Sequence, residues 1–111
     1  MSLTIITSSG NSVNAGFDHR FGRAAWFCAY DEKTGETSFY ENEFIHANQG
    51  AGTRVAERMM QLEAKRIISG DFGPKAKDLL DRFGIQLIII QDTHISVQDI
   101  INRIKNKKNN P

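Results

Sequence analysis

The chain has 111 residues, of which 40% are apolar, so it can bury one hydrophobic core and fits a single domain. Its 14 basic and 13 acidic side chains nearly cancel, which argues against a nucleic-acid partner or an acidic membrane surface. The single cysteine excludes an internal disulfide, and no apolar run approaches the ~20 residues of a membrane-spanning helix. No signal-peptide pattern opens the sequence, so we expect one cytoplasmic domain over residues 1–111, with no membrane contact.

The first part of the chain contains three short segments of β-branched and aromatic residues. Leu3–Thr7 and Trp26–Tyr30 are predicted strands, and Thr37–Glu41 follows the second strand after a short glycine-containing loop. That loop predicts an antiparallel hairpin. The first two strands are joined by a long loop from Ser8 to Arg23, which exceeds the usual length of about 4–6 residues and is therefore a candidate functional loop.

The second part of the chain changes to helical periodicity. Apolar residues at helical spacing predict a helix from Ala51 to Lys65, and a proline at the start predicts another from Pro74 to Phe83. The buried side of this second helix is predicted to carry Ala76, Leu79, Leu80 and Phe83.

The last predicted helix runs to about Lys107. It follows a capping-box pattern from Ser96 to Asp99, with Ile95 placed to contact Ile100. Two further strands are predicted between the helices, at Arg66–Ser69 and Gln86–Ile90. The second of these is apolar without alternation, so we expect it to be covered on both faces.

This order of elements predicts an α/β fold with one five-stranded mixed sheet. The strands of the second half belong to βα units and should run parallel to the first strand. The most economical strand order is 3-2-1-4-5 with helices packed on the sheet, an arrangement that resembles the three-layer ribonuclease H-like fold.

Three loops should meet beyond the carboxyl ends of the parallel strands, where open sheets of this kind bind ligands. They are Ser8–Arg23, His46–Gly52 and Ser69–Pro74. The last two precede helices, whose N-termini attract anions, and Arg20 and Arg23 could add positive charge from the first loop. The candidate cofactor-binding residues are Ser8, Ser9, Asp18, Arg20, Gly22, Arg23, Gly50, Gly52, Gly70 and Gly73.

Each of these features also has a structural interpretation. Asp18 can simply pair with one of the arginines, and glycines before helices are often caps. His19 and His46 are candidate metal ligands because both are predicted at the same end of the sheet, although neither shows helical metal-ligand spacing. Cys28 lies within a strand and is expected to be a small buried apolar residue.

Catalysis is not predicted. A ribonuclease H-type nuclease needs clustered carboxylates, one of them on the central strand, and Leu3–Thr7 carries none. Ser8 and Ser9 lack a nucleophile-elbow motif. We therefore expect a binding protein and not an enzyme.

Four motifs resemble the dinitrogenase iron-molybdenum cofactor biosynthesis family. They are Thr7–Gly10, Asp18–Ala24, His46–Gly52 and Gly70–Ala76, and the resemblance extends over nearly the whole chain. It implies a ribonuclease H-like fold and a small cytoplasmic carrier or chaperone for iron–sulfur or iron-molybdenum type cofactors, similar to nitrogenase accessory factors. It also implies a protein that donates or accepts the cofactor. His19 departs from the family pattern, in which proline is common at this position.

The leading hypothesis is thus a non-catalytic carrier that binds a metal–sulfur cluster or another anionic ligand in the three-loop pocket. Two alternatives stay open. One is a protein-interaction or regulatory module without a cofactor, pairing through the sheet edge at Thr37–Glu41. The other is a phosphate-ligand sensor that uses the same pocket.

Overall fold

The computed structural model describes residues 2–109, so Met1, Asn110 and Pro111, the ends of the predicted domain, lie outside the described residues. Five strands form one sheet in the order β3-β2-β1-β4-β5. β1 is antiparallel to β2 and parallel to β4, and β5 is parallel to β4. The predicted order and directions are confirmed. The strands are β1 (Leu3–Ser8), β2 (Trp26–Asp31), β3 (Thr37–Glu41), β4 (Arg66–Ser69) and β5 (Gln86–Ile89).

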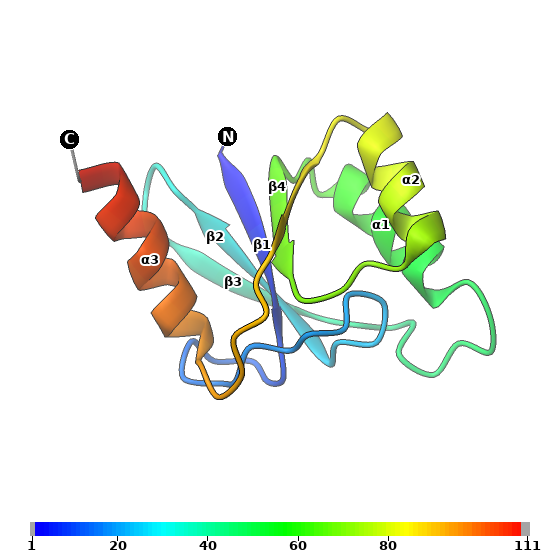
Figure 1. The fold of residues 1–111 in the computed structure, drawn as a ribbon, viewed down its shortest axis with the longest axis horizontal. Helices are drawn as coiled ribbons and strands as arrows, with labels where there is room; N and C mark the ends of the chain where they lie inside the picture. Colours follow the sequence, from blue (N-terminus) through cyan, green and yellow to red (C-terminus); the bar gives the residue numbers. More distant parts are fainter. Residues whose placement is uncertain (1, 110–111) are drawn as a thin grey trace.

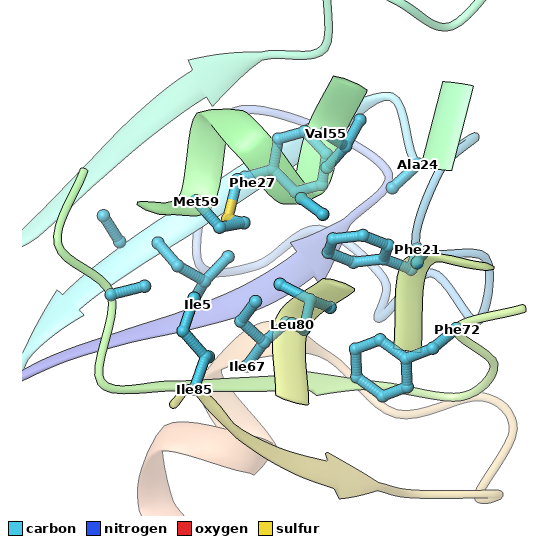
Figure 2. Packing of buried hydrophobic residues seen from close by; sticks show 14 residues of the cluster. Ile5, Phe21, Ala24, Phe27, Val55, Met59, Ile67, Phe72, Leu80 and Ile85 are labelled. Atoms are coloured by element: carbon cyan, nitrogen blue, oxygen red, sulfur yellow. The ribbon is translucent and has the colours of Figure 1, made fainter. Parts of the chain in front are cut away.

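Helices cover the two faces of the sheet and complete the three layers of the predicted α/β fold. α1 (Ala51–Gln61) and α2 (Pro74–Arg82) lie together on one face, and α3 (Val97–Asn109) lies on the other (Figure 1). Because side chains alternate along a strand, β1 contributes side chains to an apolar core on each face of the sheet. Ile5 packs under α1 and α2 with Ile67 and Leu80 (Figure 2), whereas Ile6 packs under α3.

The last strand contacts a core on both faces, as expected, because Leu87 packs against the apolar cluster under α1 and α2 and Ile88 packs against the one under α3, but this cover is incomplete. β5 is the edge of the sheet, with only β4 beside it. Leu87 and Ile88 are partly buried, and Ile89 keeps 57% of its surface exposed. An unbroken apolar run therefore does not ensure that every residue of the strand is buried.

The helix boundaries differ from prediction mainly at the end of α1. The helix ends at Gln61 and not at Lys65, because Glu63 takes a left-handed conformation with φ of 60°. α2 ends one residue before the predicted Phe83, and of its predicted buried side Ala76 and Leu80 are fully buried while Leu79 and Phe83 are partly buried.

The capping box at the start of α3 is confirmed. The Ser96 amide donates to the Asp99 carboxylate, and the Asp99 amide donates to Ser96 Oγ, at 2.9 and 3.0 Å. Ile95 and Ile100 belong to the same apolar cluster under α3. Within residues 2–109, no helix has the length and apolar character needed to span a bilayer.

Candidate functional site

The three predicted loops meet in a pocket at the carboxyl ends of β1 and β4. The pocket holds about 450 Å³, within the range of small-molecule sites. Its walls come from the long loop after β1, from the start of α1 and from the segment that joins β4 to α2. The lining residues are Arg20, Phe21, Gly22, Arg23, Gly50, Ala51, Gly52, Thr53, Asp71, Phe72, Gly73, Pro74, Lys75 and Ala76.

Phe21 anchors the long loop to the core. Its side chain is 1% exposed, and its ring centroid lies 5.2 Å from that of Phe72 and 6.3 Å from that of Phe27 (Figure 2). The Phe21 amide also donates to the Asp71 carbonyl at 3.1 Å, so the loop lies along the segment after β4. The anchor fixes the backbone on either side of Phe21, including Arg20 and Gly22.

Two glycines let the walls of the pocket approach each other closely. A Cβ atom on Gly22 would lie 2.9 Å from the Gly52 amide nitrogen, so no larger residue fits there without movement. A Cβ atom on Gly52 would lie 3.2 Å from the Ala76 Cβ. Glycine at positions 22 and 52 thus brings the long loop and the first turns of α1 and α2 together.

Buried polar contacts fix the loop on its other side. Asn42, which is 3% exposed, donates from Nδ2 to the carbonyls of Gly22 and Ala24 at 3.0 and 2.9 Å. Arg23 Nη1 donates to the Ile45 carbonyl at 2.8 Å. The loop that carries both arginines is therefore bonded to the segment leading into α1.

The pocket contains the N-termini of two helices, neither of which is capped by a side chain. α1 follows Gly50 and α2 follows Gly73, both with positive φ and without a side-chain cap hydrogen bond. The first amides of a helix have no partner within the helix, and they carry partial positive charge. Neither first turn carries an acidic residue. Both ends therefore attract an anion.

The charged side chains of the lining are mostly basic. Arg20, Arg23 and Lys75 contribute three cations against the single carboxylate of Asp71. Arg20 Nε and Nη2 both donate to Asp18 at 3.2 Å, and these hydrogen bonds, with the attraction of the Asp18 charge, raise the pKa of Arg20. The Arg20 side chain stays 67% exposed, whereas that of Asp18 is 9% exposed. Asp18 does not line the pocket, and its hydrogen bonds to Arg20 therefore orient that side chain from outside the pocket.

Several predicted site residues lie outside the pocket lining. Ser8 is buried, and its hydroxyl bonds to the Gly10 backbone. Ser9 is exposed, and its amide donates to the Gly16 carbonyl. Gly70 is buried, and a Cβ atom there would lie 2.8 Å from the His19 Cβ, so this glycine makes room for His19 and not for a ligand.

The two candidate metal-ligating histidines also lie outside the lining. His19 Nε2 bonds to the Asp92 carbonyl at 2.5 Å, and its ring meets that of Phe17 edge to face. His46 is exposed. Cys28 is fully buried under α3, on the other face of the sheet from α1 and α2, and burial raises its pKa to about 12. Among residues 2–109, no group of three or more His, Cys, Asp or Glu could hold a metal ion.

Sequence reasoning missed three residues that shape the pocket. Thr53 and Lys75 lie in the first turns of α1 and α2, and extending the two candidate loops into these turns would have included them. Asn42 gave no sequence signal, because its hydrogen bonds to Gly22 and Ala24 depend on the folded loop.

The fold is that of a small α/β protein with one five-stranded mixed sheet and a pocket at the carboxyl ends of β1 and β4. The model of the family described as dinitrogenase iron-molybdenum cofactor matches residues 1–107. The chain therefore belongs to this family, as its motifs indicated. Among curated proteins, none matches the chain significantly.

Solved structures show the same architecture. The apo form of the orange protein from Desulfovibrio gigas is 27% identical, with a TM-score of 0.88 over 97% of this chain and 90% of that chain. A NifB-like protein from Thermotoga, described as a DUF35 member and solved by NMR, has a TM-score of 0.81 over 96% of this chain and 89% of that chain. At 24% identity, this second likeness shows the fold alone.

Proposed function

We propose that the protein is a non-catalytic carrier that binds an anionic cofactor in the pocket at the carboxyl ends of β1 and β4. The observation that carries the proposal is the meeting of Arg20, Arg23 and Lys75 with two uncapped helix N-termini. Its family membership favours an iron–sulfur or iron-molybdenum type cluster as the cargo. A carrier of this kind would receive its cargo from a donor protein or deliver it to an acceptor.

The donor set of the pocket suits an anion more than a metal ion that needs protein ligands. None of the lining residues within the described part of the chain is a cysteine or a histidine. Iron–sulfur clusters fixed by a protein usually take thiolate or imidazole ligands. A cluster that brings its own ligands and carries negative charge can instead be held by guanidinium, ammonium and backbone N–H groups.

The candidate residues that line or adjoin the pocket each have a defined part in this proposal. Arg20 and Arg23 pair with the negative charge of the cargo, and Asp18 orients Arg20. Gly50 and Gly73 precede the two helices, and the free N–H groups of their first turns, which in α2 begin at Lys75 because Pro74 has none, donate to the cargo. Gly22 and Gly52 keep the walls in contact.

The proposal is tested by isolating and reconstituting the protein without oxygen. Iron and molybdenum are quantified in the purified protein, which is then reconstituted with iron and sulfide and followed by absorption spectroscopy. We expect cluster absorption that decreases in Arg20→Gln, Arg23→Gln and Lys75→Gln. The matched control is Arg82→Gln on the exposed side of α2, where Arg82 pairs only weakly with Asp78 at the surface.

Two results would contradict the proposal. One is a chain that takes up no cluster under any condition. The other is a cluster lost in Cys28→Ala, His19→Ala or His46→Ala while the pocket variants retain it, because the cargo would then be held elsewhere.

A phosphate-type ligand is the second candidate for the same pocket. Helix N-termini free of acidic residues are also phosphate sites. Calorimetric titration with inorganic phosphate and with a nucleotide distinguishes the two candidates. Saturable phosphate binding by a protein that takes up no cluster would favour the sensor.

A further inference from the structure

The His19 side chain connects loops at the carboxyl ends of two strands that are not neighbours. Its backbone belongs to the long loop after β1, whereas its ring reaches the segment that joins β5 to α3. There, His19 Nε2 donates to the Asp92 carbonyl at 2.5 Å. Because a carbonyl oxygen only accepts, this nitrogen carries the ring proton. β4 lies between β1 and β5 in the sheet, so the side chain crosses the end of β4.

The end of β4 has room for this side chain because residue 70 is a glycine. Gly70 directly follows β4 and is buried. A Cβ atom there would lie 2.8 Å from both Cβ and Cγ of His19 and 3.0 Å from its Cα. The φ angle of Gly70 is not positive, so the backbone conformation does not require glycine. The space that His19 occupies therefore explains the glycine.

Further contacts hold both ends of this connection. The His19 ring meets that of Phe17 edge to face, with the centroids 5.2 Å apart, and the His19 carbonyl accepts from Ser69 Oγ at 3.3 Å. At the other end, Arg103 of α3 donates to the Asp92 carboxylate at 2.7 Å. The hydrogen bond and the charge of Arg103 hold the pKa of Asp92 below its usual range. The segment that accepts the His19 hydrogen bond is therefore tied to α3.

His19 lies between two residues of the candidate site. Asp18 precedes it and orients Arg20, which follows it. The Arg20 amide donates to the Asp18 carboxylate at 2.9 Å, and the Phe21 amide donates to the Asp71 carbonyl at 3.1 Å. The Arg20 side chain is 67% exposed, so its position depends on the backbone and on Asp18 more than on packing. A contact that fixes the backbone at His19 therefore also places Arg20.

We propose that His19 is a positioning residue, which holds Arg20 at the pocket by tying the long loop across the end of β4 to the segment after β5. A cation that is already held in its bound position binds an anion more tightly, because less loop and side-chain freedom is lost on binding. The inference rests on the proposed function for the part that Arg20 plays in binding. It assigns no metal to His19, since Nε2 is engaged by the Asp92 carbonyl.

The first test uses the protein without cargo and follows the NMR relaxation of backbone amides at a temperature where every variant is folded. In wild type, the amides of Arg20 and Phe21 should have order parameters of about 0.85, which are typical of a rigid backbone. We expect them to fall toward ~0.6 in His19→Ala, while the amides of β1 keep their values. His19→Leu fills similar space but cannot donate a hydrogen bond, so it should behave like His19→Ala.

Rescue by a different donor separates the hydrogen bond from packing. Glutamine carries an N–H donor at the end of a long side chain, so His19→Gln should restore the order parameters of the loop. His94→Asn is the matched control, because it removes an exposed imidazole from the same segment after β5. His94 has a φ of 61°, a conformation that asparagine tolerates. The control should therefore match wild type.

Binding is measured second, with the cluster reconstituted from iron and sulfide as the probe. At limiting iron and sulfide, cluster absorption should fall about 3–10-fold in His19→Ala and His19→Leu, the factor that one hydrogen bond contributes, and should persist in His19→Gln and His94→Asn. A chain that takes up no cluster in any form contradicts the proposed function, and the relaxation measurement then decides the part of His19 by itself. The inference is overturned by an Arg20 amide as ordered in His19→Ala as in wild type, by a His19→Gln variant no better than His19→Leu, or by a cluster that His19→Ala and wild type bind equally.

Discussion

The close approach of Gly22 to the first turn of α1 gives a sharp test of how the pocket is built. Replacing Gly22 with alanine would place a methyl group 2.9 Å from the Gly52 nitrogen, 3.0 Å from the Gly52 Cα and 3.4 Å from the Ala51 carbonyl carbon. All three are backbone atoms, so no side-chain rotation relieves the contact. The long loop or the helix has to shift.

Overpacking of this kind costs ~1–3 kcal/mol. For a domain of this size, each kcal/mol lowers the melting temperature by roughly 4 °C, so we expect Gly22→Ala to melt about 4–12 °C below wild type. The shift also displaces Arg20 and Arg23 from the N-terminus of α1. Binding of an anionic cargo should therefore weaken even at temperatures where the variant is fully folded.

The measurement is a thermal melt followed by circular dichroism, combined with a binding titration. Gly16→Ala is the matched control in the same loop, since its added Cβ would meet only Ser9 Oγ at an ordinary 3.4 Å and its φ is not positive. We expect this control to melt close to wild type. Equal melting temperatures and equal binding for the two variants would refute the argument that Gly22 is fixed against Gly52.

Three further predictions follow from the core and the pocket. Phe21→Ala should lower the free energy of unfolding by ~3–5 kcal/mol, measured by urea denaturation, because the ring is 1% exposed; a loss below ~1 kcal/mol would contradict the anchoring role. Burial raises the pKa of Cys28 from 9.0 to about 12. The stability that the neutral thiol contributes should therefore be complete below pH 9 and lost as the pH rises toward 12, and this loss should be shallower in Cys28→Ala. Affinity for an anionic cargo should fall with ionic strength in wild type and less steeply in Lys75→Gln, and identical salt dependences would show that Lys75 lies outside the interaction.

A second residue, Tyr30, also contributes to the loss of stability predicted at high pH. Tyr30 is also buried, and burial followed by the charges of Glu32 and Asp31 raises its pKa. Its effect on stability has the same sign as that of Cys28, because in both cases the unfolded state loses its proton first as pH rises. Cys28→Ala should therefore reduce the loss of stability without abolishing it, and an unchanged pH profile would show that the thiol does not contribute.

The elements themselves could be predicted from the sequence because their determinants are local. The helical spacing of apolar residues, Pro74 at the first position of α2 and the Ser96–Asp99 capping box each act within a few residues. Strand order could also be predicted, since βα units restrict the sheet to few topologies. The motifs at the loops were enough to indicate the family that matches residues 1–107.

Tertiary structure decided which residues of those loops line the pocket. Arg20 and Gly22 line the pocket, whereas the Ser8 hydroxyl donates to the Gly10 carbonyl and Gly70 makes room for the His19 side chain. The tertiary structure also decided that Ile89, at the end of the apolar run Gln86–Ile89, stays exposed. A one-dimensional pattern specifies the local conformation and the apolar character of a segment, but burial and contact depend on which distant segments pack against it. For this reason the sequence pointed to the three loops, and only the folded chain brought Arg20, Arg23 and Lys75 to two helix N-termini.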